Sequence, residues 1–438
     1  MAIKEGNLEA PKRAPIDWKN PNYYEHDSLF NEMERVFDAC HGCRRCVSLC
    51  DSFPTLFDLV DESETLEVDG VSKDDYMKVV DQCFLCDLCA ETKCPYLPPH
   101  EWAIDFPHLM LRAKAYKHEN APAKWRDRLL TSTDATFGIL SHPAIAPIVN
   151  VALASKPLRK VIDKAVGVHH EAPLPKFGRA SHKKDFVENP QAPSKKSPAK
   201  VAIFATCYDK NTQSSLIEDL ILVLEHNDIQ TELIMDAKCC GMPKLELGDL
   251  PRVENLKDIN FPKFLELIES GYDLISPIPS CVLMYKQEIP LMFPEDQNAL
   301  AIKKKFFDPF EYLMLKTKEG SSNTNFVNSL GKVSYHAACH QRVQNFGAKT
   351  RDFLSLIPDT EISMIERCSG HDGTYAVKSE TYDKAKKLVG RVQRQTQENA
   401  PDFFGSDCPM AGRLIENNIE GTAISKHPIS MVRHAYGI

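Results

Sequence analysis

Cysteine is the residue type whose number and spacing in this chain point most directly to chemistry. The 438 residues include 15 cysteines, and eight of these lie in two short runs, residues 40–50 and 83–94. Clustered thiolates bind metal centres or, in exported proteins, pair as disulfides. The first residues, MAIKEGNLEAPKR, have charges but no apolar stretch of the kind found in export signals, so we expect a cytoplasmic protein in a reducing compartment. The sequence therefore predicts that the thiols are ligands.

The two runs have the spacing of ferredoxin-type 4Fe-4S ligands. CHGCRRCVSLC follows C-x2-C-x2-C-x3-C, and CFLCDLCAETKC has one extra residue in its last gap. Three thiolates two residues apart wrap one face of a cubane, and the fourth cysteine of each run typically ligates the other cluster. The predicted ligands are Cys40, Cys43, Cys46 and Cys94 for the first cluster, and Cys83, Cys86, Cys89 and Cys50 for the second. Zinc is the alternative, but it usually takes separated C-x2-C pairs.

The other seven cysteines fall in two matching halves of residues 201–438. VAIFATC (201–207) aligns with VSYHAAC (333–339), and QTELIMDAKCCG (230–241) aligns with DTEISMIERCSG (359–370). Two matches in the same order predict an internal duplication. The first half contains Cys207, Cys239, Cys240 and Cys281, and the second contains Cys339, Cys368 and Cys408.

Alternating strands and helices must position these seven cysteines. VAIFA and TELIM are predicted strands, QSSLIEDLILVLEH (213–226) is a predicted amphipathic helix, and residues 379–395 form the long helix of the second half. Such alternation predicts an α/β domain with a largely parallel sheet. The cysteines follow the strands, where open α/β sheets place their sites. The expected fold is a multidomain α+β and α/β protein, with a helical ferredoxin-like domain before a duplicated α/β domain.

Changes in composition divide the chain into six predicted segments. These are an N-terminal arm (1–31), a ferredoxin-like domain with two 4Fe-4S clusters (32–110), a helical connector (111–170), a Pro- and Lys-rich linker (171–200), a first repeat (201–325) and a second, degenerate repeat (326–438). The longest apolar run, residues 144–154, is interrupted by Pro147 and Asn150. We expect it to be a packed core helix, with an interfacial membrane contact as the alternative.

The remaining composition excludes several classes of protein. The 61 acidic and 53 basic side chains leave a formal charge of −8, whereas nucleic-acid-binding proteins normally have a basic patch. No apolar run reaches the 18 residues of a membrane-spanning helix. Neither G-x-G-x-x-G nor G-x-x-x-x-G-K-[ST] occurs, so we expect any flavin or nucleotide to be bound by another subunit.

The cysteine motifs of the two halves resemble a known family. The pattern C-x31-CCG followed by PSC, and its echo CSG followed by DCPMA, resemble the CCG domains of heterodisulfide reductase and related iron–sulfur subunits. The resemblance extends over nearly the whole chain. The chain particularly resembles iron–sulfur subunits of anaerobic glycerol-3-phosphate dehydrogenases, in segments such as RDRLL (126–130), YHAACH (335–340) and GTYAVKSETY (373–382). In this family a full motif has five cysteines and can hold a non-cubane 4Fe-4S cluster.

Three departures from the family pattern leave the cofactors of the two halves open. Ile278 takes the place of one cysteine in the first half, and Ser369 and Ala411 take the places of two in the second. The first half then keeps four thiols, for a further iron–sulfur cluster or zinc. The second keeps three, and His340 or His371 is a candidate for the missing ligand, since imidazole ligates both iron and zinc. A second half that holds nothing is the third alternative.

The resemblance implies an electron-transfer subunit rather than an enzyme in its own right. Such a subunit takes electrons from a flavin dehydrogenase partner, glycerol-3-phosphate dehydrogenase being one candidate, and delivers them toward the quinone pool at the inner face of the membrane, where the acceptor is quinone or a membrane-anchored protein. Alternatives are a thiol- or heterodisulfide-type reductase subunit, an adaptor with structural zinc, and a partner of a rubrerythrin-like peroxidase. Neither flavin nor nucleic acid is expected to bind this chain.

Overall fold

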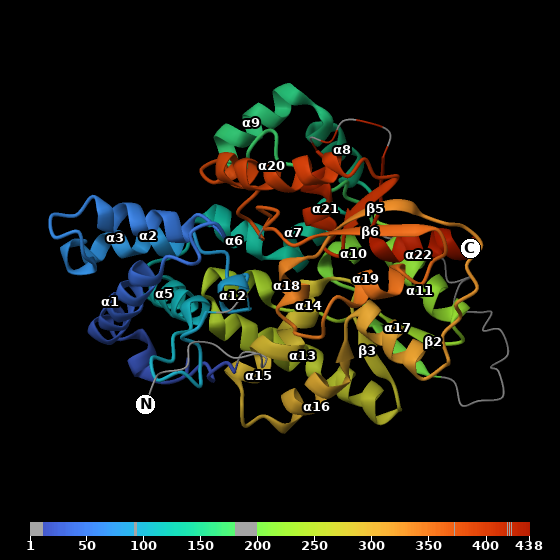
Figure 1. Ribbon diagram of the computed structural model, residues 1–438, viewed down its shortest axis with the longest axis horizontal. Helices are drawn as coiled ribbons and strands as arrows, with labels where there is room; N and C mark the ends of the chain where they lie inside the picture. Colours follow the sequence, from blue (N-terminus) through green and yellow to red (C-terminus); the bar gives the residue numbers. More distant parts are fainter. Residues whose placement is uncertain are drawn as a thin grey trace.

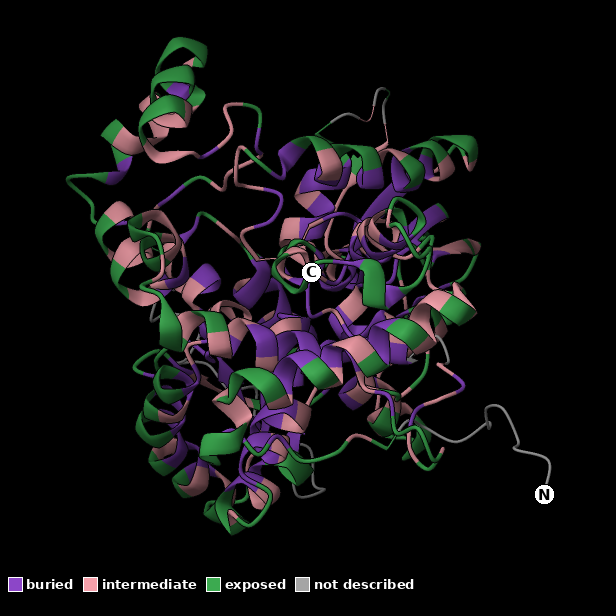
Figure 2. Cartoon of the chain, turned by 90° about the vertical axis from the view of Figure 1, so that its left-hand side faces the viewer, coloured by how far each residue is buried: buried purple, intermediate pink, exposed green. Residues whose placement is uncertain are grey.

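Two small parallel sheets and a separate helical unit make up the fold (Figure 1). The computed structural model describes residues 12–91, 94–179, 199–371, 373–417, 419, 421 and 423–438. Most of the predicted linker, residues 180–198, and the first part of the predicted N-terminal arm, residues 1–11, lie outside this range. Buried residues gather between the layers, and the outward faces of the helices are exposed (Figure 2).

The helical unit contains both ferredoxin-like cysteine runs and lies at one side of the molecule (Figure 1). Its helices are α1 (His26–Cys43), α2 (Ser52–Asp61), α3 (Lys73–Asp81), α4 (Leu88–Glu91) and α5 (Phe106–Asn120), with short 3₁₀ turns η1 (Pro21–Tyr24) and η2 (Val68–Gly70). In α1, apolar residues at positions 29, 30, 33, 36 and 37 form one buried face. The Glu25 carboxylate caps its first turn, and Arg44, in the left-handed region at φ 49°, ends it.

Four further helices connect this unit to the sheets. They are α6 (Trp125–Thr131), α7 (Thr133–Leu140), α8 (Ala146–Ala154) and α9 (Lys156–Val166). The apolar run at 144–154 is helical, but the expectation that it packs in the core is wrong: the exposed fractions of Ile148 and Val151 are 71% and 68%. None of the helices in the described part of the chain is long and apolar enough to cross a membrane.

The two sheets have the same strand order, and all of their strand pairs are parallel. The first is β2-β1-β3-β4, built from β1 (Lys200–Phe204), β2 (Gln230–Ile234), β3 (Asp273–Ile275) and β4 (Phe306–Phe307); the second is β6-β5-β7-β8, built from β5 (Gly331–His336), β6 (Thr360–Ile365), β7 (Phe403–Ser406) and β8 (Ile424–Ser425). The predicted parallel α/β architecture is confirmed. The duplication and the six domain limits stay predictions.

Helices cover both sheets and join the two halves. The first half has α10 (Cys207–Asn211), α11 (Leu216–His226), α12 (Met242–Leu247), α13 (Leu250–Glu269), α14 (Pro279–Leu283), a π-helical turn η4 (Met284–Glu288), α15 (Ile289–Met292), α16 (Gln297–Lys305) and α17 (Pro309–Lys318). The second half has α18 (Cys339–Arg342), α19 (Lys349–Leu354), α20 (Tyr382–Glu398), α21 (Pro409–Glu416) and α22 (Pro428–Tyr436). Helix α11 packs on α22, where the buried Asn227 side chain approaches the Tyr436 hydroxyl at 3.3 Å.

The contact between the helical unit and the first half predicts a large cost for one glycine substitution. Gly248 ends α12 at φ +84°, and a Cβ there would lie 2.4 Å from the Lys114 carbonyl oxygen of α5. We expect Gly248→Ala to lower the free energy of unfolding by about 2–5 kcal/mol, since a left-handed alanine costs about 1–2 kcal/mol and overpacking adds about 1–3 kcal/mol. Gly271→Ala is the matched control, because φ is +86° but no atom lies within 4 Å. Equal losses in anaerobic urea unfolding would contradict this packing.

Candidate metal centres

The first predicted ligand set comes together at the end of α1. Cys40 and Cys43 lie in its last turns, Cys46 follows in the next loop, and Cys94 arrives from the second cysteine run. Burial, followed by the neighbouring Cys94, Cys46 and Cys43 thiols, raises the pKa of Cys40 well above its usual value. The pKa of Cys46 rises to about 12 for the same reasons. Burial also raises the pKa of Cys94, and four mutually adjacent thiols of this kind fit a site completed by a cationic centre.

The second predicted ligand set lies beside the first. Cys50 is half-buried next to Cys83 and Cys86, and Cys89 is half-buried among Cys86, Cys83, Cys50 and Cys46. The fourth cysteine of each run thus lies with the first three of the other run, as crossed ligation requires. Ligation itself stays a prediction.

The loop that holds the second set has a constrained backbone. Leu85 and Asp87, which alternate with its cysteines, both adopt the left-handed region, at φ 53° and 59°. The Leu85 N–H points at the Cys83 Sγ, 3.5 Å away. Non-glycine residues in this region cost free energy and persist where the surrounding structure holds them. Here they turn a backbone donor toward sulfur, which suits a cluster ligand.

A buried charged network fixes Asp87. The Arg13 guanidinium contacts Asp87 and Asp105, each at 2.6 Å, and His108 lies 3.2 Å from Asp105 and 3.3 Å from Glu288. Burial raises the pKa of Asp87, although Arg13 opposes this. The network joins the N-terminal segment, α5 and η4 of the first half directly behind the second ligand set. It therefore acts as the support of that loop.

The four cysteines of the first half lie at the carboxyl ends of three strands. Cys207 begins α10 after β1, Cys239 and Cys240 follow β2, and Cys281 lies in α14 after β3. Cys207 contacts Cys239, and Cys240 contacts both Cys239 and Cys281. Contacts from Cys207 and Cys240 lower the pKa of Cys239 well below its usual value, whereas the pKa of Cys207 and that of Cys240 are raised. The set is one connected group of thiols, as the sequence predicted from strand-end placement.

Side chains far away in sequence hold this group. The Cys239 N–H donates to Asp134 of α7 at 2.7 Å, and Thr133 contacts the thiols of Cys207 and Cys239. Asn260 of α13 accepts from the Lys238 N–H at 2.7 Å. Gly241, at φ +100°, lets the chain turn directly after the cysteine pair, and its N–H approaches Cys239 Sγ at 3.5 Å. Sequence spacing alone does not identify Thr133, Asp134 or Asn260.

The three cysteines of the second half occupy the equivalent strand ends. Cys339 begins α18 after β5, Cys368 follows β6, and Cys408 caps α21 after β7. Cys339 and Cys368 are in contact, and the Gly370 N–H lies 3.3 Å from Cys368 Sγ. A Cβ on Gly370 would lie 2.4 Å from the Ala385 carbonyl oxygen, so glycine is required at this turn. Cys408 lies on the same cavity as the other two cysteines.

The histidines near this site differ in how many hydrogen bonds their ring nitrogens make. His336 bonds Ser406 Oγ through Nδ1 and the Arg367 carbonyl through Nε2, both at 2.9 Å, so it is structural. His340 Nδ1 bonds Ser280 at 2.8 Å. His371 Nε2 is buried without a hydrogen-bond partner, and burial lowers the pKa of His371 to about 4. A neutral imidazole with an unused nitrogen fits a metal ligand.

The second ferredoxin-like set touches the second half directly. The Cys86 thiol contacts the Cys339 thiol, and Cys50 lies near Cys368. Phe84 stacks edge-on against Tyr375 with ring centroids 4.3 Å apart. The sequence placed these two cysteine groups in separate domains and gave no indication of this contact.

One cavity of about 160 Å³ connects the cysteine groups of both halves. Its walls include all seven of their cysteines, together with Cys86, His340 and His371. The three residues that replace family cysteines, Ile278, Ser369 and Ala411, also line it and are buried. The departures from the family pattern therefore fall inside the site and bear on its ligand set.

The described part of the chain thus has a cysteine-rich α/β fold, with cysteines at the carboxyl ends of parallel strands. Residues 201–286 match the family model of the cysteine-rich CCG domain. That range contains the four first-half cysteines. Residues 201–286 are therefore similar to the CCG cysteine-rich domain, which confirms the resemblance seen in the sequence for this segment.

Three relatives show what the chain is similar to. It is 27% identical over 333 residues to the C subunit of the anaerobic glycerol-3-phosphate dehydrogenase of Escherichia coli (strain K12), covering 75% of this chain and 81% of that protein. Lactate utilization protein A of Bacillus licheniformis is 24% identical over 48% of this chain and 87% of its own length. The B subunit of the fumarate reductase (CoM/CoB) of Methanothermobacter marburgensis is 25% identical over 51% of this chain and 42% of its own length.

The buried network predicts a pH-dependent stability. Burial and Arg13 oppose protonation of His108, but Asp105 and Glu288 raise its pKa from 6.5 to about 9. Because the folded pKa lies above the unfolded one, the stabilisation is complete below pH 6.5 and is lost as the pH rises through 9. We expect the stability difference between wild type and His108→Gln to fall by up to roughly 3 kcal/mol over this range. Urea unfolding at pH 6, 7.5 and 9 measures it, with His118→Gln on the same helix as control; a difference independent of pH would contradict the assignment.

Proposed function

We propose that this chain is an iron–sulfur electron-transfer subunit of an oxidoreductase complex. It would take electrons from a flavin dehydrogenase partner, for which glycerol-3-phosphate dehydrogenase is the first candidate, and deliver them toward the quinone pool. The observation that carries the proposal is the crossed grouping of eight thiols next to the second half. Similarity to a dehydrogenase subunit and a reductase subunit supports a partner that performs the substrate chemistry.

The N-terminal unit holds the two cubane sites in this proposal. We assign Cys40, Cys43, Cys46 and Cys94 to one cluster, and Cys83, Cys86, Cys89 and Cys50 to the other. Bound 4Fe-4S clusters would each accept and donate one electron at a time, which matches a two-electron flavin donor to a one-electron route. The chain's own contribution is to keep the ligands adjacent, to direct N–H groups at sulfur and to exclude water through burial.

For the first half we favour an iron–sulfur cluster over zinc. Cys207, Cys239, Cys240 and Cys281 form a connected row in which neighbours touch. In the described residues, two groups of candidate ligand atoms lie entirely within 4.8 Å, and neither includes a cysteine. Four sulfurs around one zinc ion, each at about 2.3 Å from the metal, would lie about 3.8 Å apart. The four sulfurs of this row are spread more widely than the ligands of a single zinc ion, which suits a centre with several metal ions.

In the second half we assign Cys339, Cys368 and Cys408 to a third site, with His371 as the favoured fourth ligand. Within the described part of the chain, the Nε2 atoms of both His371 and His340 are buried on the shared cavity without a hydrogen-bond partner, and His371 is favoured because the Nδ1 of His340 already bonds Ser280. Contact between Cys86 and Cys339 puts the ligand shells of the second cubane and of this site side by side. Electron transfer between the N-terminal unit and the second half therefore needs no intervening residue.

We further propose that α6–α9 bind at a membrane surface, near the quinone pool. Large apolar side chains on these helices face outward; they include Trp125, Ile139, Ile148, Val151, Leu158 and Val161. Exposed lysines of α9, Lys156, Lys160 and Lys164, lie among them. Apolar side chains interspersed with cations are typical of helices that lie in the interface of anionic bilayers.

Metal analysis tests the two cubane sites and their crossed ligands. We expect anaerobically prepared protein to contain about eight cubane irons. Cys94→Ser should alter the same EPR signal as Cys40→Ser, and Cys50→Ser the same signal as Cys83→Ser. Ser48→Ala, an exposed position inside the first run, is the control and should keep both signals. If Cys94→Ser matches Cys83→Ser instead, the crossed assignment is wrong; iron near zero after anaerobic reconstitution would refute the proposed function.

Vesicle binding tests the membrane surface. The double variant Ile148→Ser, Val151→Ser should bind phosphatidylglycerol-containing vesicles at least about tenfold more weakly in co-sedimentation, since burial of each aliphatic side chain is worth about 1.5–3 kcal/mol. Val327→Ser is the matched control, because Val327 is exposed but lies outside α6–α9. Equal binding by both variants, or no binding by wild type, would exclude α6–α9 as a membrane contact without affecting the metal assignment.

A further inference from the structure

The end of the helical connector docks on α20 through a short, well-held turn. The His169 N–H donates to the Val377 carbonyl at 2.8 Å, and the Ser379 N–H donates to the Gly167 carbonyl at 3.0 Å. The ring of His169 stacks on Tyr382 of α20, with centroids 3.9 Å apart. Nothing in the electron-transfer proposal uses this junction, which contains neither a cysteine nor a residue of the shared cavity.

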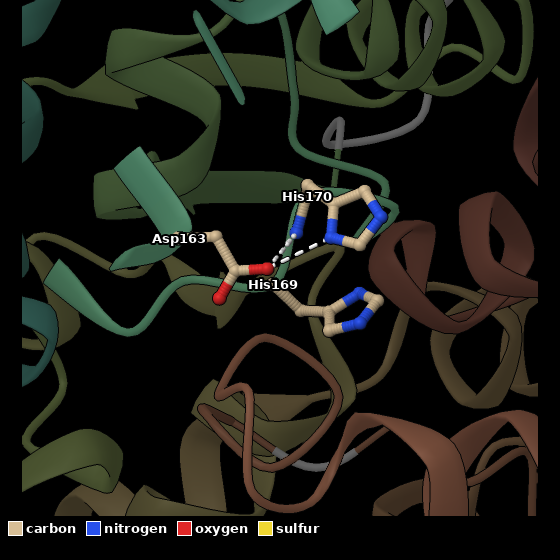
Figure 3. A group of neighbouring side chains, drawn as sticks. All are labelled: Asp163, His169 and His170. Carbon is tan, nitrogen blue, oxygen red and sulfur yellow. Dashed lines mark hydrogen bonds and ion pairs between the residues drawn. The ribbon is translucent and has the colours of Figure 1, made fainter. Parts of the chain in front are cut away.

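We propose that Asp163, His169 and His170 form a binding site for a divalent transition metal such as Zn²⁺. One carboxylate oxygen of Asp163 and one ring nitrogen of each histidine all lie within 4.8 Å of one another. Figure 3 shows Asp163, from the last turns of α9, directed at the two adjacent imidazole rings of the following turn. Two imidazoles and a carboxylate are a ligand set that zinc and its neighbours in the first transition row prefer.

The backbone of the turn is held in place before any metal binds. Arg159, whose exposed fraction is 5%, donates to the carbonyls of His169 and Ala172 at 2.7 Å and to that of His170 at 3.0 Å. The His170 N–H donates to Asp163 Oδ2 at 3.2 Å. A site whose ligands are already oriented loses less entropy on binding, and such orientation is typical of working metal sites.

The charges at the turn favour a cation. Although burial opposes ionisation, hydrogen bonds from Ser379 and His170 lower the pKa of Asp163 to about 2, so it is a carboxylate at neutral pH. Burial, and then the neighbouring His170, lower the pKa of His169, which keeps this imidazole neutral and able to ligate. Lys386 pairs with Glu171 at 2.9 Å, so this nearby ammonium is already neutralised.

For the Asp163–His170 pair, only a small adjustment separates the present arrangement from a coordinated one. Asp163 Oδ2 and His170 Nδ1 are 2.8 Å apart, as a hydrogen-bonded pair. Ligands at about 2.0–2.1 Å from a tetrahedral zinc ion lie about 3.4 Å apart, so the two atoms need to separate by roughly half an ångström. The bound ion would fix the His169 ring against Tyr382 and thereby hold the connector on the second half. Nitrogen and oxygen donors distinguish this site from every cysteine site in the chain.

Zinc binding to the intact, cluster-loaded protein tests the site. After anaerobic purification with a chelator, calorimetry should show one zinc equivalent whose affinity falls at least tenfold in His169→Ala and in His170→Ala. His142→Ala, an exposed histidine elsewhere on the connector, is the matched control and should bind as wild type does. X-ray absorption at the zinc edge should show nitrogen and oxygen neighbours with imidazole scattering and no sulfur shell.

Each result decides the proposal. Loss of the bound zinc equivalent in both histidine variants, with unchanged iron content and circular dichroism, supports the site. It does so even if the proposed electron-transfer function is refuted. A sulfur shell near about 2.3 Å would place the zinc at cysteines and overturn it. Equal affinity in wild type and both variants, or no zinc equivalent at all, would overturn it too.

Discussion

Burying several thiols next to one another is the constraint on which the rest of this structure depends. In the helical unit, loss of water and then the neighbouring thiols raise the pKa of Cys40 and of Cys50, so both effects disfavour their thiolates. Ligation requires thiolates, so the unit gains stability from any cationic centre that compensates them. A frame of other residues holds the thiols together. It consists of the surrounding helices, the left-handed residues Leu85 and Asp87, and the charged network behind Asp87.

That frame also decides where the N-terminal unit meets the rest of the chain. The loop with Cys83 and Cys86 faces the second half, with Phe84 packed on Tyr375 and Cys86 against Cys339. Residues behind the loop, His108 and Glu288, join the unit to the first half. This short loop therefore contacts the second half, while α5 behind it joins the unit to the first half through Glu288 and α12.

Local patterns in the sequence were enough to predict the parallel sheets and the strand-end cysteines. VAIFATC and VSYHAAC each end a buried strand with a cysteine, and chain connectivity then brings parallel strand ends to one edge. Supporting residues such as Asp134 could not be predicted, because Asp134 reaches Cys239 across 105 positions of sequence. The apolar run at Ile148 was misjudged because hydrophobic content alone does not distinguish a core helix from an exposed one.

The two halves share a strand order, yet different parts of the chain close their cysteine sites. Over the first half, α7 of the connector contributes Thr133 and Asp134, which contact the thiols or their backbone. Over the second half, the ferredoxin-like loop takes this position and contributes the Cys86 thiol. The half that has lost two family cysteines, at Ser369 and Ala411, is thus the one in direct contact with another thiol site. Closure by the loop rather than by a helix places the Cys86 thiol on the wall of the shared cavity at this half.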